Sequence, residues 1–367
     1  MRRPRQRLTR LTTVATLVLT VLAVLPSATP AAAAGVPFYG DVTGDGYVDQ
    51  IIPGNTSDRC TLSVYPGDSI GRFGAPTAHP YVLPEAEPGT THCPDDGTVI
   101  DIGGDGTVEI VLVWCCAPPV DYGLLIMRNF QPVGTMPGEW EHDRIGTANF
   151  NGDSLADLYT GTYFGGFNSY LNTAGGSLVP GPMGFGCLLW DVELAEFNGN
   201  GRQDAVLSCT DYPTEAGVYV LFDNGTHLAL HSAPAPGSSV WEIEVLDVNA
   251  DGRTDVRTKP LGTGTATVWL SRGNGTFGTT PIANDDLAHA YRNTPKVIKV
   301  RVNDLASSAA TLAITQPPRY GYLTNVDSRY EVKYVRTAPH TLTDTFVYRL
   351  TEAGLSDTAT VSVKMKD

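Results

Sequence analysis

The chain has little positive charge, with 25 Lys and Arg residues against 39 Asp and Glu residues and a formal net charge of −14. Nucleic acids and anionic membranes are bound by basic patches, and the sequence offers none, so we expect no nucleic-acid partner. Long apolar runs are scarce as well. Beyond Leu25 no stretch approaches the roughly 18 residues of a membrane-spanning helix, so we expect no membrane span in the mature protein.

The familiar hydrolase motifs are also missing. There is no G-x-S-x-G and no H-E-x-x-H, and the seven His residues are scattered. Residues outside the loops could serve as a general acid or base, such as Glu139, Glu141, His142 and Asp143 in the segment GEWEHDRIG. Charges at a strand edge explain these residues equally well. The sequence therefore favours a non-catalytic protein and leaves an enzyme as the alternative.

Residues 1–34 have the composition of a secretory signal peptide. A basic start, MRRPRQRLTR, precedes an apolar run from Leu11 to Leu25 and the small-residue segment PSATPAAAAG. We expect cleavage near Ala34 and a secreted, extracellular bacterial protein. Cleavage would remove five Arg residues and no acid, which moves the formal charge from −14 to −19.

One nine-residue pattern occurs five times. The copies are loop 1 (DVTGDGYVD, 41–49), loop 2 (DIGGDGTVE, 101–109), loop 3 (NFNGDSLAD, 149–157), loop 4 (EFNGNGRQD, 196–204) and loop 5 (DVNADGRTD, 247–255). Their starts are 60, 48, 47 and 51 residues apart. A single copy could be a plain turn, because Asp, Asn and Gly are common turn residues. Five copies at a period near 50 indicate a repeat architecture.

The residue types suit a hard divalent cation. Each copy has an oxygen-bearing side chain at positions 1, 5 and 9, and position 6 is Gly or Ser. Ca²⁺ takes six to eight oxygen ligands, which a tightly curled loop can supply from alternate positions. The predicted metal ligands are Asp41, Thr43, Asp45 and Asp49; Asp101, Asp105 and Glu109; Asn149, Asn151, Asp153 and Asp157; Glu196, Asn198, Asn200 and Asp204; and Asp247, Asn249, Asp251 and Asp255.

The five loops differ in completeness. Loop 5 is the most complete. Loop 1 has the weaker ligand Thr43 at position 3, and loop 2 has Gly103 there, so that a water or another group would have to substitute. Loop 4 has two charges and is expected to bind more weakly. Loop 3 begins with Asn149 and has Ser154 at position 6. An EF-hand is excluded, because position 12 carries no Glu and strand-like segments follow each loop.

The loops resemble the FG-GAP/VCBS repeat of integrin alpha subunits and of many secreted bacterial proteins. RFGAP at Arg72–Pro76 and GNGTFG at Gly273–Gly278 resemble the flanking parts of that repeat. The resemblance implies a β-propeller over residues 35–281 with calcium in a loop between two strands of each blade. Five loops favour five blades, and six or seven stay possible.

Six cysteines in an exported chain favour disulfides. Six cysteines allow fifteen pairings. Because a propeller blade brings neighbours in sequence together, we expect Cys60–Cys93 and Cys187–Cys209. The adjacent Cys115 and Cys116 are left as a vicinal bridge or as free thiols.

Residues 282–367 lack the loop motif and alternate apolar and polar residues, as in VIKVRV, EVKYV, TFVYRL and TATVSVKM. About seven strands in this length predict a β-sandwich. AND near Asn284, VND at Val302–Asp304 and TQPPRYG at Thr315–Gly321 resemble bacterial Ig-like/cadherin-like domains. Asp286 and Asp304 are candidates for a further calcium site, although solvated turn acids are the favoured interpretation.

Together these features predict an all-β protein, a β-propeller followed by an Ig-like β-sandwich. We expect a secreted, calcium-binding, non-catalytic binding or adhesion protein whose ligand is an extracellular glycan or protein. The alternative is a propeller-based polysaccharide lyase or glycoside hydrolase.

Overall fold

The computed structural model describes residues 35–366 except 56–58, 87–91, 115–119, 121, 138–141, 164, 211–215, 250, 263, 292–293, 325–330 and 338–342. All regular structure in this part of the chain is β-strand, which confirms the predicted all-β class. The described residues form no helix long and apolar enough to cross a membrane. The predicted signal peptide and the pair Cys115–Cys116 lie outside the described residues.

Within the described residues before the C-terminal part, five four-stranded antiparallel sheets follow one another along the chain. The first contains β1 (Phe38–Gly40), β2 (Asp49–Asn55), β3 (Cys60–Tyr65) and β4 (Thr77–Tyr81). The second contains β5 (Asp96–Ile100), β6 (Glu109–Val113), β7 (Leu124–Arg128) and β8 (Gln131–Met136). The third contains β9 (His142–Ala148), β10 (Asp157–Thr162), β11 (Gly166–Thr173) and β12 (Ser177–Phe185). The fourth contains β13 (Leu188–Ala195), β14 (Asp204–Thr210), β15 (Gly217–Leu221) and β16 (His227–His231). The fifth contains β17 (Trp241–Leu246), β18 (Asp255–Pro260), β19 (Thr267–Ser271) and β20 (Phe277–Gly278).

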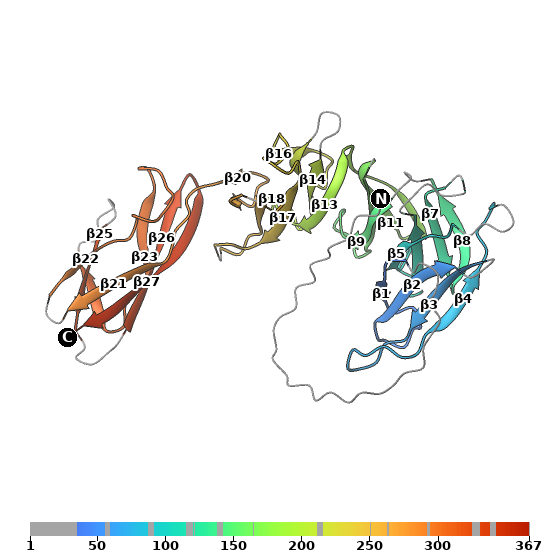
Figure 1. Ribbon diagram of the computed structural model, residues 1–367, viewed down its shortest axis with the longest axis horizontal. Coiled ribbons are helices and arrows are strands. Elements are labelled where there is room, and N and C mark those ends of the chain that lie inside the picture. The colour runs from blue at the N-terminus through green and yellow to red at the C-terminus, as the bar shows by residue number, and fades with distance from the viewer. Residues whose placement is uncertain are drawn as a thin grey trace. The chain divides into compact units, whose positions relative to one another are not determined.

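Each of these sheets is a meander, because its strands pair in the order in which they occur in the chain. Figure 1 shows the strands of each meander side by side, in colours that run in chain order. Burial follows the number of covered faces. In β2 buried and half-buried residues alternate, whereas β6, β14 and β15 are buried along their whole length. A strand covered on both faces carries a continuous apolar run, and a strand covered on one face alternates.

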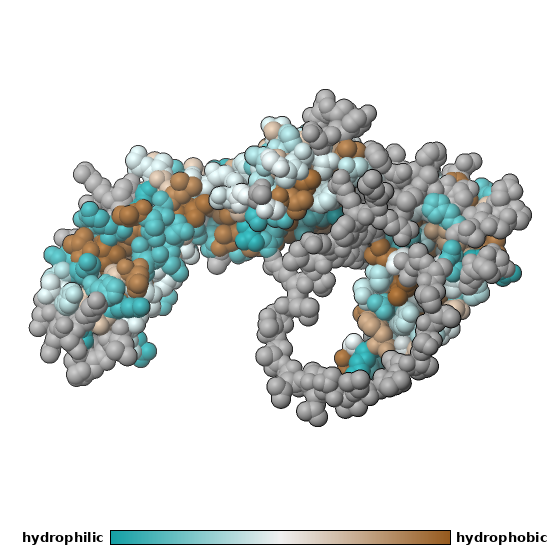
Figure 2. Space-filling view, viewed as in Figure 1, coloured by the Kyte–Doolittle hydropathy of each residue, from teal (hydrophilic) through white to brown (hydrophobic). Residues whose placement is uncertain are grey.

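The hydrophobic cores lie between consecutive sheets. Successive residues of β6 point to opposite faces, so Leu112 packs in a core with the first sheet and Val111 in a core with the third. Two further cores lie between the third and fourth sheets and between the fourth and fifth. On the visible face of the molecule, Figure 2 shows hydrophobic residues as separate brown patches among hydrophilic ones. This pattern agrees with burial of most apolar side chains between sheets.

The two end sheets differ from the inner three. The outer face of the fifth sheet carries the ion pairs Glu244–Arg257 and Glu242–Lys259. On the first sheet, Tyr39 is 51% exposed. Among the described strands, no pairing and no shared core joins the fifth sheet to the first. A closed propeller therefore stays a prediction.

The described residues of the C-terminal part form seven strands in two sheets. One sheet has the order β21 (Asp286–Tyr291), β27 (Leu355–Lys366), β26 (Thr343–Glu352) and β23 (Thr311–Gln316). The other has the order β22 (Lys296–Lys299), β25 (Glu331–Arg336) and β24 (Gly321–Thr324). Both sheets contribute to one core, for example through Val332 and Phe346. The strand expected at VIKVRV is shorter than predicted, because the chain turns after Lys299.

Both predicted disulfides are confirmed. Cys60 at the start of β3 is bonded to Cys93, which precedes β5, and both residues lie in the core between the first two sheets. Cys187 is bonded to Cys209 of β14 in the core between the third and fourth sheets.

Candidate metal-binding loops

All five loops occupy the same place in their sheets. Each begins directly after the first strand and joins it to the second, and its position 9 is the first residue of that second strand. The glycines at position 6, Gly46, Gly106, Gly201 and Gly252, have φ between 78° and 87°, a conformation that favours glycine. The repeat seen in the sequence is therefore a structural repeat as well.

The side chain at position 1 curls each loop by accepting hydrogen bonds from backbone N–H groups of positions 3 to 6. In loop 1 the two Asp41 oxygens accept from Gly44 at 2.7 Å and from Gly46 at 2.8 Å. In loop 5 the Asp247 oxygens accept from Asp251 at 3.1 Å and from Gly252 at 2.9 Å. These bonds draw carboxylate oxygens towards the middle of the loop.

The acid at position 9 is buried in every loop. Asp49, Asp157, Asp204 and Asp255 are 0% exposed and Glu109 is 2% exposed. One oxygen of each accepts the backbone N–H of position 2 at distances between 2.8 and 3.0 Å. In four loops the other oxygen accepts a backbone N–H at the end of the third strand or just beyond it, from Gly67, Asn172, Asp223 and Ser271. Position 9 therefore ties its loop to the third strand.

Loop 5 has the most complete set of side-chain oxygen atoms that could ligate a metal ion. Asn249 is 4% exposed, and its side-chain oxygen Oδ1 accepts a hydrogen bond from the Asp251 backbone N–H at 3.1 Å. Burial, and then the charges of Asp251 and Asp247, raise the pKa of Asp255 to about 6. The neighbouring negative charges repel the charge of Asp255, and a bound cation would relieve this repulsion.

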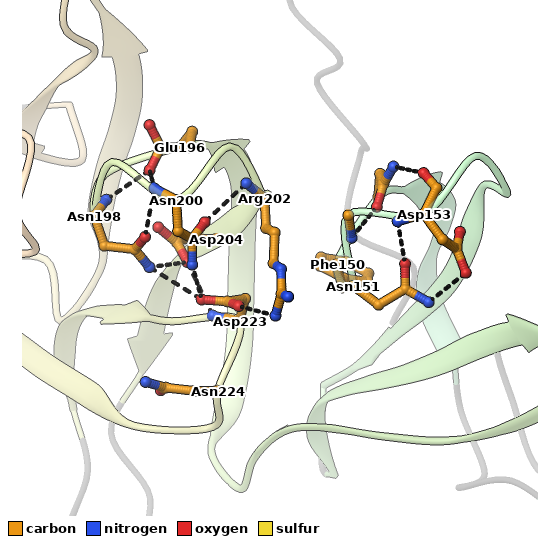
Figure 3. Close-up of polar contacts among 12 residues, drawn as sticks. Phe150, Asn151, Asp153, Glu196, Asn198, Asn200, Arg202, Asp204, Asp223 and Asn224 are labelled. Atoms are coloured by element: carbon orange, nitrogen blue, oxygen red, sulfur yellow. Dashed lines mark hydrogen bonds and ion pairs between the residues drawn. The ribbon is translucent and has the colours of Figure 1, made fainter.

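The sequence did not predict Asp223, which belongs to loop 4 in space. It is 5% exposed, and its Oδ1 accepts from Asn198 Nδ2 at 3.0 Å and from Asn200 Nδ2 at 2.8 Å (Figure 3). Its Oδ2 lies 3.2 Å from Arg202. The available signal was weak, because Asp223 opens the turn DNGT and has the appearance of an ordinary turn residue.

Asp223 changes the charge of loop 4. Counted by sequence, this loop has two acids, Glu196 and Asp204. The third carboxylate lies beside them, and burial together with the charges of Asp223 and Glu196 raises the pKa of Asp204 to about 6. Arg202 offsets part of this negative charge.

Asn172 joins two neighbouring sheets at their loops. This residue is 1% exposed, and its Oδ1 accepts the Gly103 N–H of loop 2 at 2.8 Å. Its Nδ2 donates to the carbonyl oxygens of Asp101 at 2.8 Å and Ala156 at 3.0 Å. Loops 3 and 4 are joined in a similar way, because Gln203 exchanges hydrogen bonds with the Asn149 backbone.

The donor chemistry of the loops fits calcium, since carboxylate and amide oxygens are the ligands of that ion. Within the described residues, no group of three or more His, Cys, Asp or Glu side chains is already gathered as a metal site. In the loops, many of these oxygens accept backbone N–H groups instead.

The remaining residues named from the sequence are the acid–base candidates and the further calcium candidate. Glu139 and Glu141 lie outside the described residues, as do the side chains of His142 and Asp143. Asp286 begins β21, and its Oδ2 is buried with no hydrogen-bond partner among the described residues. The interpretation of Asp286 as a solvated turn acid is therefore wrong.

No protein-family model matches the chain, and no curated protein matches it. Among solved structures, the V. cholerae biofilm matrix protein Bap1 is similar over 92% of this chain and 62% of its own, at 14% identity and a TM-score of 0.40. This chain thus spans less than two thirds of that protein's length.

Two further solved structures show similarity. BBS1N in complex with ARL6DN is similar over 85% of this chain and 94% of its own, at 11% identity and a TM-score of 0.35. An endo-fucoidan hydrolase of glycoside hydrolase family 107 is similar over 63% of this chain and 40% of its own, at 10% identity and a TM-score of 0.20. At these TM-scores the three similarities assign no function.

Proposed function

We propose that the chain is a secreted, calcium-binding, non-catalytic binding or adhesion protein. In this proposal the five meanders are blades of a β-propeller, and the C-terminal two-sheet part is an Ig-like domain. The observation that carries the proposal is the repetition of one acidic loop at the same corner of five consecutive sheets, each with a buried acid at position 9. The two disulfides support an extracellular location, where such bonds persist.

In this proposal calcium has a structural role. Positions 1, 3, 5 and 9 supply oxygen ligands, and the ion neutralises carboxylates that otherwise repel one another. Such repulsion is present in loop 5, where burial and then the charges of Asp251 and Asp247 raise the pKa of Asp255. A metal bound only by the folded chain stabilises the fold.

The surface beside loop 1 supports a glycan or protein ligand. Five hydrophobic side chains are between 43% and 66% exposed there: Tyr39, Tyr47, Val48, Ile70 and Phe73. The rings of Tyr39 and Phe73 lie 6.0 Å apart, and the bridge between Gly67 and Phe73 holds the 66–74 turn. Exposed aromatic rings can cover the apolar face of a sugar or a side chain of a partner protein.

Calcium titration calorimetry on the purified, chelator-treated protein tests the metal part of the proposal. We expect saturable binding, and one ion fewer in the Asp247→Asn, Asp251→Asn variant. A variant with Glu242→Gln and Glu331→Gln is the matched control, because it loses the same charge from exposed strand positions. Absence of binding to the wild-type chain would refute a calcium role.

Glycan and protein arrays test the binding part. The variant Tyr39→Ala, Phe73→Ala is expected to lose the captured ligand while its melting temperature stays close to that of the wild type. If this variant still captured the ligand, the binding surface would have to lie elsewhere on the protein.

A further inference from the structure

Loop 2 departs from the other four loops at position 3, where no side chain can be accommodated. Gly103 has φ of +91°, and a Cβ built there would lie 2.8 Å from the Gly176 Cα atom of the neighbouring sheet. Its N–H is already bonded to Asn172. Position 3 of loop 2 therefore cannot offer a side-chain ligand, unlike Asn249 in loop 5.

Loop 2 also differs from the other four loops at position 9. Glu109 replaces the Asp of the other loops and is longer by one methylene group. Its Oε2 accepts the Ile102 N–H at 2.8 Å, as position 9 does elsewhere. Its Oε1 accepts a hydrogen bond from Nε of Arg128, whereas in the other loops this second oxygen accepts a backbone N–H.

Arg128 also reaches position 5. Its second guanidinium nitrogen lies 3.3 Å from Oδ2 of Asp105, so one guanidinium group joins positions 5 and 9 of loop 2. Arg128 is the last residue of β7 and pairs in register with Glu109. At the same register the other four sheets have the uncharged residues Pro66, Leu171, Phe222 and Leu270.

The arginines of loops 4 and 5 are arranged differently. Arg202 forms an ion pair with Asp223, and Arg253 lies 3.6 Å from Asp251, so each contacts a single carboxylate. Arg128 alone among these three joins two positions of one loop. Because Glu109 is 2% exposed, its charge requires a partner, and the guanidinium group provides one.

We propose that Arg128 is the resident cation of loop 2 and that this loop folds without calcium. This inference rests on the proposed calcium role of the other loops. A divalent ion placed among Asp101, Asp105 and Glu109 would meet the positive charge of Arg128 and would lack a ligand from position 3. The number of calcium ions bound by the chain is then smaller than the number of loops.

Calcium stoichiometry gives the first test, with three proteins compared after chelator treatment. The Asp101→Asn, Asp105→Asn variant of loop 2 is expected to bind as many ions as the wild type. The Asp247→Asn, Asp251→Asn variant of loop 5 is expected to bind one fewer. Loss of one ion in the loop 2 variant would overturn the proposal.

A double-mutant cycle in chelator gives the second test and is independent of calcium. Arg128→Gln is expected to lower the melting temperature by several degrees, and Glu109→Gln, Arg128→Gln together by less than the sum of the single changes. Additive effects would overturn the proposal. If the wild type bound no calcium, the proposed function would fail, and this cycle would still decide whether Arg128 neutralises loop 2.

Discussion

At the scale of single residues, the acid at position 9 of loop 1 accepts more backbone N–H groups than either acid that precedes it in that loop. In loop 1, Asp49 accepts the backbone N–H groups of Val42, Thr43 and Gly67 at 2.9 to 3.0 Å, and it is fully buried. Asp45 accepts one N–H group, from Tyr47, and is exposed. The two acids of one loop can therefore be compared directly.

We expect Asp49→Ala to reduce the free energy of unfolding by about 3 kcal/mol in the presence of chelator, because it leaves three backbone donors without an acceptor. Asp45→Ala is the control and is expected to cost less than about 1 kcal/mol. Urea unfolding measures both. Equal losses would show that position 9 has no special structural role.

A second prediction concerns pH and Asp286. Burial, and then the charge of Asp304, raise the pKa of its carboxyl from 3.8 to about 7. The folded state therefore binds a proton that the unfolded state has released between these two pH values. Stability contributed by the neutral carboxyl is present below pH 4 and is lost as the pH rises towards 7.

Asp286→Asn is accordingly expected to raise the melting temperature at pH 7.5 and to leave it nearly unchanged at pH 4. Scanning calorimetry at both pH values measures this difference. Glu331→Gln serves as the control, since it changes an exposed acid of the same C-terminal part that does not contribute to the raised pKa of Asp286. An equal effect of Asp286→Asn at both pH values would contradict the raised pKa.

At the scale of elements, the contacts between loops of neighbouring sheets are expected to be as important as the loops themselves. The Asn172 side chain makes three hydrogen bonds, of which two join the third sheet to loop 2 and one is to Ala156 of loop 3. Replacing it with Ala leaves buried partners unpaired, so we expect a loss of about 2 kcal/mol in urea unfolding. Asn224→Ala changes an exposed turn amide and is the control. A loss equal to that of the control would show that the bridge is unimportant.

The strands and loops were predictable from sequence because their signals are local. The nine-residue pattern and the strand-like segments that follow it indicate β2, β6, β10 and β14 directly. Asp223 and the contacts of Arg128 were not predictable in the same way. Each residue reaches its loop from the end of a third strand, so its role depends on strand register, which the local pattern does not specify.

At the scale of the whole molecule, calcium is expected to stabilise the fold. An ion present at 100 times its dissociation constant adds about 2.7 kcal/mol per site. Chelator is therefore expected to lower the melting temperature by several degrees, and excess Ca²⁺ is expected to restore it. Mg²⁺ is expected to restore less, because it demands a stricter geometry. A melting temperature that does not respond to chelator would contradict the proposed metal role.

The order of the sheets has a consequence for how the chain is made. Every meander is complete once its own stretch of sequence has emerged, and its core forms with the sheet made just before or just after it. Contacts between neighbours in sequence favour fast folding and let structure grow along the chain. The protein can thus assemble from its N-terminal sheet onwards, because each finished sheet offers an apolar face on which the next sheet can pack.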